Sequence, residues 1–173
     1  IDAQVEIINQ NQNKNSEMAW GTAYLTHALN DMAVATGDAK YLRANLKLVR
    51  ASLANTDRKK GYQTFFGEIS PGWGTGQYSA GRWVVHPVHT GIISFGIVEF
   101  LRLARQDDAL MAELGDEYGR MLADVTAAMD WHDRQWVDGP AADEGHYIFK
   151  DNEPGTDGRV KPANRQSSMG RAL

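Results

Sequence analysis

The sequence predicts an all-α fold made of antiparallel helical hairpins. Apolar residues recur at three- and four-residue steps in several segments, and short turns join these segments in pairs. Long segments rich in glycine and aromatic residues separate one pair from the next. The chain of 173 residues is 42% hydrophobic and 23% charged, as is ordinary for one globular domain. We therefore expect residues 1–173 to form a single domain.

The first expected helix follows an irregular lead-in that includes the polar run at residues 9–15, and Ser16 is placed to cap it. We expect His27, on its inward face, to be a hydrogen-bonded core histidine, with a role in a site as the alternative. The residues that share this face are Trp20, Ala23, Tyr24, His27, Ala28, Asp31, Met32 and Ala35.

Thr36-Gly37-Asp38 ends this helix and begins the next. Gly37 can adopt the left-handed conformation at a helix C-terminus, and Asp38 can accept amide hydrogens of a new N-terminus. The second helix is amphipathic, and so short a turn requires the two helices to run antiparallel. Its apolar stripe consists of Leu42, Leu46, Val49 and Leu53.

Residues 57–88 break the helical period. A loop this long inside a compact domain is usually functional or disordered, and its aromatic content argues against disorder. We therefore expect a functional loop. Its glycines and aromatics are Gly61, Gly67, Gly72, Gly74, Gly76, Gly81, Tyr62, Phe65, Phe66, Trp73, Tyr78 and Trp83.

A third helix is expected at about residues 89–105, and it is apolar on most sides and therefore buried on most sides. A fourth, at about residues 116–133, is amphipathic again, and we interpret Trp131-His132 at its end as structural, with a cation favoured at a helix C-terminus.

A second long excursion covers residues 136–160, and a short strand is expected within it at residues 146–149. A fifth helix begins near Pro162, and the sequence stops within it at Leu173. The first, third and fifth helices should share one direction. Both long loops should then emerge at the same end, where Trp83 and Tyr147 would line one pocket.

Several stretches resemble the α/α-toroid domains of carbohydrate-active enzymes, a group that includes polysaccharide lyases, unsaturated glucuronyl hydrolases and glucuronyl C5-epimerases. These stretches are residues 20–24, the turn at residues 36–38 followed by Tyr41-Leu42, residues 86–91, residues 164–166 and residues 170–173. A complete toroid has more hairpins than this chain supplies. The resemblance therefore implies the N-terminal part of a toroid, truncated at the C-terminus.

The first long loop and the start of the third helix hold the most concentrated set of reactive side chains. Tryptophan stacks on the apolar faces of sugar rings, and Arg82 can neutralise a carboxylated sugar. Uronate lyases and epimerases begin by removing a proton beside a carboxylate, for which His89 and Tyr78 would be base and acid. The alternative is that Trp83 plugs the toroid and His86 only caps a helix. The complete set is Trp73, Tyr78, Arg82, Trp83, His86 and His89.

The second loop and the fifth helix add His146, Tyr147, Asn164 and Arg165 as expected substrate contacts, since a helix N-terminus can face a bound anion. No pair of acids stands out as the two carboxyl groups of a hydrolase, and we expect the acids of this loop to be solvated. The loop's acidic residues are Asp138, Asp143, Glu144, Asp151, Glu153 and Asp157.

Composition excludes several partners. The net charge is −4 with no basic stripe, so nucleic acid is not expected, and the apolar run at residues 92–100 is too short to span a membrane. Cysteine is absent, and the histidines at positions 86 and 89 have no third ligand at suitable spacing, so we expect neither a metal nor another cofactor. Oligomeric state and compartment leave no mark on the sequence.

We predict that the protein processes an oligo- or polysaccharide by lyase or epimerase chemistry, and that this glycan contains uronate. A glycoside hydrolase on the same fold is one alternative. A helical-repeat module that binds a glycan or a protein without catalysis is the other.

Overall fold

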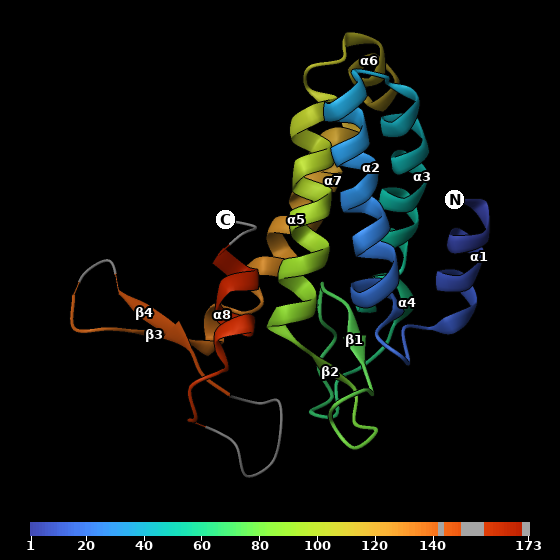
Figure 1. The fold of residues 1–173 in the computed structure, drawn as a ribbon. Coiled ribbons are helices and arrows are strands. Elements are labelled where there is room, and N and C mark those ends of the chain that lie inside the picture. Colours follow the sequence, from blue (N-terminus) through green and yellow to red (C-terminus); the bar gives the residue numbers. More distant parts are fainter. Residues whose placement is uncertain (142–143, 150–157, 171–173) are drawn as a thin grey trace.

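The computed structural model describes residues 1–141, 144–149 and 158–170 and confirms a mostly helical fold (Figure 1). Short strands pair as β1 (Gly74–Thr75) with β2 (Val84–Val85) and as β3 (Trp136–Asp138) with β4 (Gly145–Tyr147), both antiparallel. The helices are α1 (Asp2–Asn11), the π-helical turn η1 (Met18–Thr22), α2 (Ala23–Thr36), α3 (Lys40–Ala54), α4 (Asp57–Lys60), α5 (Pro87–Ala104), α6 (Asp108–Leu114), α7 (Asp116–Asp130), the 3-10 turn η2 (Asp133–Gln135) and α8 (Ala163–Gly170).

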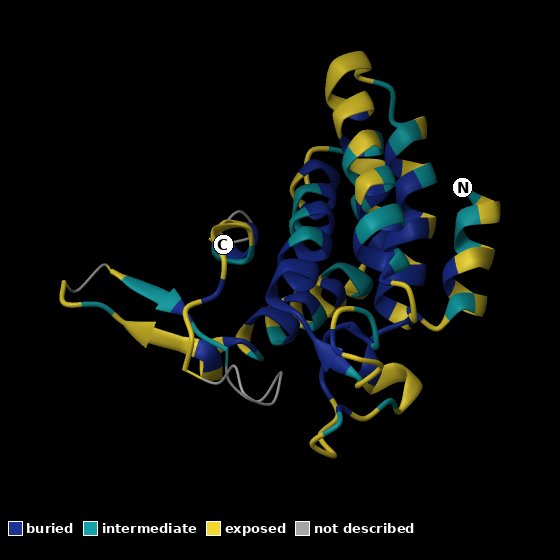
Figure 2. Cartoon of the chain, turned by 60° about the horizontal axis from the view of Figure 1, so that its bottom comes forward, coloured by how far each residue is buried: buried dark blue, intermediate teal, exposed yellow. Residues whose placement is uncertain are grey.

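Helix α5 is the centre of the fold. It contacts α2, α3, α7 and α8, and Figure 2 shows buried residues along most of its length. By length and composition α5 could also cross a membrane, but 72% of its residues are buried inside this fold. That burial is what a central core helix requires, and it explains why this segment is apolar on nearly every side.

The turn between α2 and α3 forms as predicted. Gly37 has a φ of 66°, and its amide donates to the Ala33 carbonyl at 2.9 Å. The Asp38 carboxylate accepts the Lys40 amide at 2.9 Å. Because the turn is so short, α3 returns alongside α2 and places its predicted apolar stripe in the core (Figure 1).

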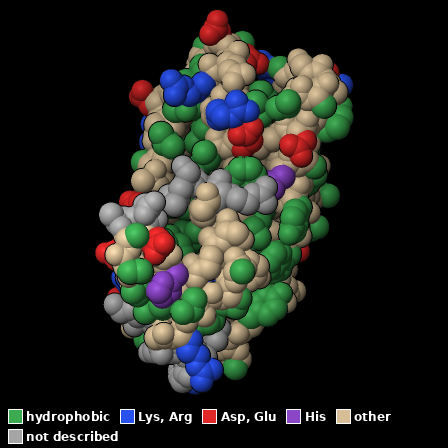
Figure 3. All heavy atoms as spheres, turned by 60° about the vertical axis from the view of Figure 1, so that its left-hand side comes forward, with side chains coloured by type: hydrophobic (Ala, Val, Ile, Leu, Met, Phe, Trp, Pro, Cys, Tyr) green, Lys and Arg blue, Asp and Glu red, His purple; other side chains and the backbone are tan. Residues whose placement is uncertain are grey.

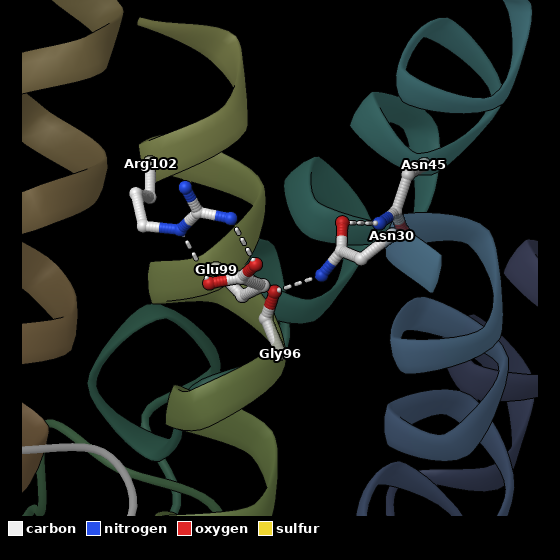
Figure 4. A network of polar contacts seen from close by, with 5 residues as sticks. All are labelled: Asn30, Asn45, Gly96, Glu99 and Arg102. Atoms are coloured by element: carbon white, nitrogen blue, oxygen red, sulfur yellow. Dashed lines mark hydrogen bonds and ion pairs between the residues drawn. The ribbon is translucent and has the colours of Figure 1, made fainter. Parts of the chain in front are cut away.

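Three helices are joined in the core by a buried polar network (Figure 4). Asn30 on α2 donates to the Gly96 carbonyl on α5 at 2.9 Å. Asn45 on α3 donates to the Asn30 side-chain oxygen at 2.8 Å and to the Thr26 carbonyl at 3.0 Å. Both asparagines are at most 2% exposed, so these bonds replace hydration that the folded chain excludes.

Replacing Asn30 with leucine should therefore lower the free energy of unfolding by about 2–3 kcal/mol, since the buried Asn45 amide loses one of its two acceptors and the Gly96 carbonyl loses its side-chain donor. Urea denaturation measures this change. The neighbouring substitution Asp31→Leu, at an exposed position, is the control and should change stability by less than about 0.5 kcal/mol. Equal effects of the two substitutions would contradict the importance of the network.

Several elements differ from the prediction. The expected irregular lead-in contains α1, because Ile8 packs into the core although polar residues follow it. Ser16 has a φ of 57° and donates its hydroxyl to Thr75, so it does not cap the helix; its carbonyl starts the η1 turn instead. Helix α6 was not predicted, and the fourth helix ends at Asp130, before η2.

The first long loop contains α4 and the β1–β2 pair, and the second contains the β3–β4 pair. Of the strand predicted at residues 146–149, the first two residues lie in β4, and Ile148 forms an isolated bridge with Val160. Helices α2, α5 and α8 run in the same direction, so both loops lie toward one end of the helices (Figure 1).

Candidate functional site

The N-terminus of α5 carries two buried histidines one helical turn apart. His86 directly precedes the helix, and Pro87 occupies its first turn, where no intrahelical bond needs its missing amide hydrogen. His86 and His89 are each 1% exposed, and their ring centroids lie 5.1 Å apart. The predicted pair of histidines is therefore brought together, but inside the protein rather than at its surface.

Most nitrogen atoms of this pair have no hydrogen-bond partner among the described residues. His86 Nε2 lies 3.2 Å from the Gln77 carbonyl, whereas His86 Nδ1 and both nitrogens of His89 have no such contact. Burial, with the positive charge of Arg165 as a further cause, lowers the pKa of His86 to about 4. Burial and the neighbouring His86 lower the pKa of His89 to about 3. Both rings are thus neutral near pH 7 and retain unused polar atoms.

Tyr78 lies next to both imidazoles. Its ring centroid is 6.4 Å from that of His86 and 6.1 Å from that of His89, and the residue is 58% exposed. Its φ of 66° is unusual for a residue with a side chain, and strain of this kind often accompanies functional positions. The loop between β1 and β2 thus places a solvent-accessible phenol beside two buried bases.

Trp20 extends the cluster toward α2. It lies in the π-helical turn η1, and its ring meets that of His89 edge-on at a centroid distance of 5.1 Å. The Tyr24 ring stacks on Trp20 at a centroid distance of 6.5 Å. The Trp20 indole N–H has no acceptor in the part of the chain that the structure describes. The helical spacing placed both aromatics on the inward face but gave no reason to include them in a site.

A groove of about 300 Å³ runs beside this cluster, between α2, α5 and α8. Hydrophobic side chains continue down the right-hand side of the face shown in Figure 3. Polar groups reach the groove from α8. The residues that line it are Trp20, Tyr24, His27, Val88, Gly91, Ile92, Phe95, Asn164, Ser167 and Ser168.

Helix α8 supplies the positive charge. Asn164 lines the groove, and the charge of Arg165 lowers the pKa of His86 and His89. The Arg165 guanidinium also stacks over Phe149 at 5.0 Å from the ring centroid. Lys161, which is 2% exposed, packs against the same ring at 4.5 Å. Of the predicted pair, Arg165 therefore acts on the predicted histidines, whereas Asn164 lines the groove.

Other predicted residues lie elsewhere. Arg82 is exposed and stacks over Phe65 at 5.3 Å. The arginine whose charge lowers the pKa of His89 is Arg165. Trp73 is 1% exposed, and its indole donates to the Ser52 carbonyl at 2.8 Å, which makes it a core residue with no face available to a sugar. Trp83 packs edge-on against Tyr62 in a separate hollow.

The remaining two predicted substrate contacts, His146 and Tyr147, lie on β4. Tyr147 is buried in a second core cluster with Met129 and Met169, and it packs on Trp136 at 5.0 Å. His146 is partly exposed opposite Val137. Trp83 lines the separate hollow and Tyr147 lies in the second core cluster, so neither residue lines the groove. Of the second loop's acids, Asp143, Asp151, Glu153 and Asp157 lie outside the described residues.

Two further histidines have hydrogen-bonded positions. His27 Nε2 lies 3.0 Å from the Ile92 carbonyl, so the expected hydrogen bond forms, but the residue is only half-buried and its side chain lines the groove. His132 is fully buried between Gln135 Oε1 at 3.0 Å and Thr90 Oγ1 at 2.9 Å. Burial lowers the pKa of His132 to about 3, so it does not act as the cation expected at the end of this helix.

Asp57 is a buried carboxyl that no sequence motif singled out. It is 1% exposed and accepts the Gly74 amide at 3.0 and 3.1 Å. Burial raises its pKa to about 7, against the lowering effects of the Gly74 amide and of the Trp83 indole, which faces the carboxyl without forming a well-aligned bond. The carboxyl fixes the start of β1, and only its position inside the polar run at residues 55–60 hinted at this role.

Asp57 should make stability depend on pH in a defined direction. Its folded pKa is raised above the unfolded value of 3.8, so its stabilising contribution is complete below pH ~4 and is lost as pH rises through about 7. The variant Asp57→Asn does not titrate. Between pH ~5 and ~8, urea unfolding should show the wild type losing roughly 2–3 kcal/mol relative to this variant. A constant difference between the two proteins would contradict the burial of an ionisable carboxyl here.

Comparison with protein-family models found no matching family, and comparison with curated proteins and with solved structures found no match. Within residues 1–141, 144–149 and 158–170, no three histidine, aspartate or glutamate side chains converge as a metal site would require. The groove and the buried pair His86 and His89, which meets it through Trp20, are therefore the features that bear on function.

Proposed function

We propose that this chain is part of an α/α-toroid enzyme that processes a uronate-containing polysaccharide by lyase or epimerase chemistry. The observation that carries the proposal is the cluster of Trp20, Tyr78, His86 and His89, on which the charge of Arg165 acts and which meets the groove through Trp20. Buried polar atoms are normally hydrogen-bonded in proteins, so unused nitrogens on two adjacent imidazoles favour a ligand that completes them.

The chemistry needs a place for the carboxylate, a base and an acid. Arg165 supplies positive charge, and the carboxylate of a bound uronate would raise the pKa of the imidazoles that it approaches. His89 then removes the proton beside the carboxylate, and Tyr78 donates a proton to the leaving oxygen or to the opposite face of the sugar. Trp20 and Tyr24 offer aromatic faces to neighbouring sugar rings.

Access to His89 requires a movement, because its side chain is 1% exposed. The exposed, strained Tyr78 is the group best placed to turn aside. Closure of the β1–β2 loop, which carries Tyr78, over a bound sugar would afterwards exclude water from the reacting atoms.

Glycoside hydrolysis receives less support from the groove. Such enzymes use two carboxyl groups that flank the scissile bond. None of the described residues that line the groove is an aspartate or a glutamate. Binding without catalysis is the second candidate, favoured by the deep burial and low pKa of His89.

The test is incubation of the protein with mannuronate, guluronate, galacturonate and glucuronate polymers in deuterated water. A lyase produces the ultraviolet absorbance of an unsaturated uronate, and an epimerase leaves deuterium at C5 of the sugar. We expect one of these products from the wild type and a loss with Tyr78→Phe. Tyr41→Phe, on α3, is the matched control. Tight binding of a polymer with neither product would establish the non-catalytic candidate instead.

A further inference from the structure

A second hollow lies apart from the groove, where α1 and α4 end. Gln12 follows α1 with a φ of 55°, and Gly61 follows α4 with a φ of 72°. Together with Tyr62, Gln63 and Trp83 they line a volume of about 410 Å³. None of these five residues lines the groove beside the histidines.

Trp83 is held in a fixed position at the wall of this hollow. Its carbonyl accepts the Phe65 amide at 3.0 Å, and the Tyr62 ring meets it edge-on at 5.2 Å and 70°. The indole nitrogen lies over Gly74, where a Cβ atom would approach it to 2.1 Å. A side chain at position 74 would collide with the indole, so the Trp83 ring packs directly against the backbone of Gly74. Trp83 nevertheless stays partly exposed.

The side chains that line the hollow are all uncharged and able to form hydrogen bonds. They are two primary amides, a phenol and an indole, and no charged residue from the described parts of the chain lines the hollow. Amides supply both donors and acceptors, and fixed aromatic rings supply apolar area at little entropic cost. This combination matches a pyranose ring, which has hydroxyl groups around its edge and apolar C–H faces. A lining of uncharged residues disfavours an acidic sugar.

We propose that this hollow is a binding site for a neutral sugar residue, with Trp83 and Tyr62 as the aromatic wall and Gln12 and Gln63 as the hydroxyl contacts. The proposal goes beyond the acidic-sugar chemistry of the groove and does not depend on it. A chain with both sites holds a glycan at two points, or holds a mixed glycan through its neutral residues.

Isothermal titration of the wild type with neutral hexasaccharides of glucose, mannose, galactose and xylose tests the proposal. We expect binding of at least one, and about tenfold or greater loss of affinity with Trp83→Ala, in line with the worth of one aromatic contact. Trp136→Ala is the matched control, because Trp136 is a partly exposed tryptophan on β3. It should leave the affinity unchanged.

Gln63→Ala is the second variant, for the case that Trp83→Ala disturbs β2. Gln63 is exposed, so its removal spares the core, and we expect at least about threefold weaker binding. The proposal is overturned if no neutral hexasaccharide binds the wild type, or if neither substitution weakens binding. Uronate turnover is measured separately, so a failure here is distinguishable from a failure of the proposed reaction.

Discussion

His89→Leu is expected to lower uronate turnover by orders of magnitude while changing the stability of the fold little. The leucine removes the proposed base, for which a loss of about 10²–10⁴-fold in kcat is usual. It also removes two buried nitrogen atoms that have no partner among the described residues, and replacing such atoms by apolar ones is neutral or stabilising. We expect the free energy of unfolding to fall by no more than about 1 kcal/mol.

His132→Leu is the matched control, since His132 is equally buried in the same region. Both of its nitrogens are bonded, to Gln135 and to Thr90, and leucine would remove both of these buried hydrogen bonds. We expect a loss of roughly 2–3 kcal/mol in the free energy of unfolding. Urea denaturation and turnover assays on both variants measure the contrast. If His89→Leu destabilises as much as His132→Leu, His89 is a structural residue.

Gly91→Ala is expected to detach α8 from α5. A Cβ atom at Gly91 would lie 2.3 Å from the Ser168 carbonyl oxygen and 2.8 Å from the Met169 amide nitrogen. Both contacts are with backbone, which no side-chain rotation relieves. The helices must therefore separate, with a cost at or above the roughly 1–3 kcal/mol of ordinary overpacking. Arg165 and Asn164 would move away from the histidines, and uronate turnover should be lost.

Gly119→Ala provides the control for this substitution. Gly119 lies within α7, and a Cβ atom there would meet no atom of the described residues within 4 Å. Alanine should therefore stabilise the helix by about 0.5–1 kcal/mol. Thermal unfolding and hydrogen exchange of the α8 amides distinguish the two variants. Unchanged protection of α8 in Gly91→Ala would contradict the close packing of these helices.

Local rules predicted the elements whose causes are local. The turn at Gly37 and the start of α8 just after Pro162 depend on backbone preferences of single residues, and both form as expected. Helix α5 begins at Pro87, two residues before its expected start. Helix α1 was missed because its stability comes from Ile8 packing against a distant part of the chain. The fold class was therefore predictable, whereas the first helix required tertiary contacts.

The candidate site shows the same division. The spacing of His86 and His89 predicted their proximity, because one helical turn separates them. Trp73 and Trp83 belong to the same glycine-rich loop, yet one is a core residue and the other lines a hollow. Burial depends on how the loop folds over α3, which no local pattern encodes. Which arginine acts on the histidines, Arg82 or Arg165, likewise depends on the position of α8.

The most direct measurement is an imidazole ¹⁵N–¹H spectrum of the protein, titrated with a uronate oligosaccharide and with its carboxyl-reduced, neutral counterpart. If the groove receives an acidic sugar at the α5 N-terminus, the ring signals of His86 and His89 shift with the acidic ligand and stay in place with the neutral one. Unchanged signals of both rings at saturating uronate, or equal shifts with both ligands, would contradict the proposed function.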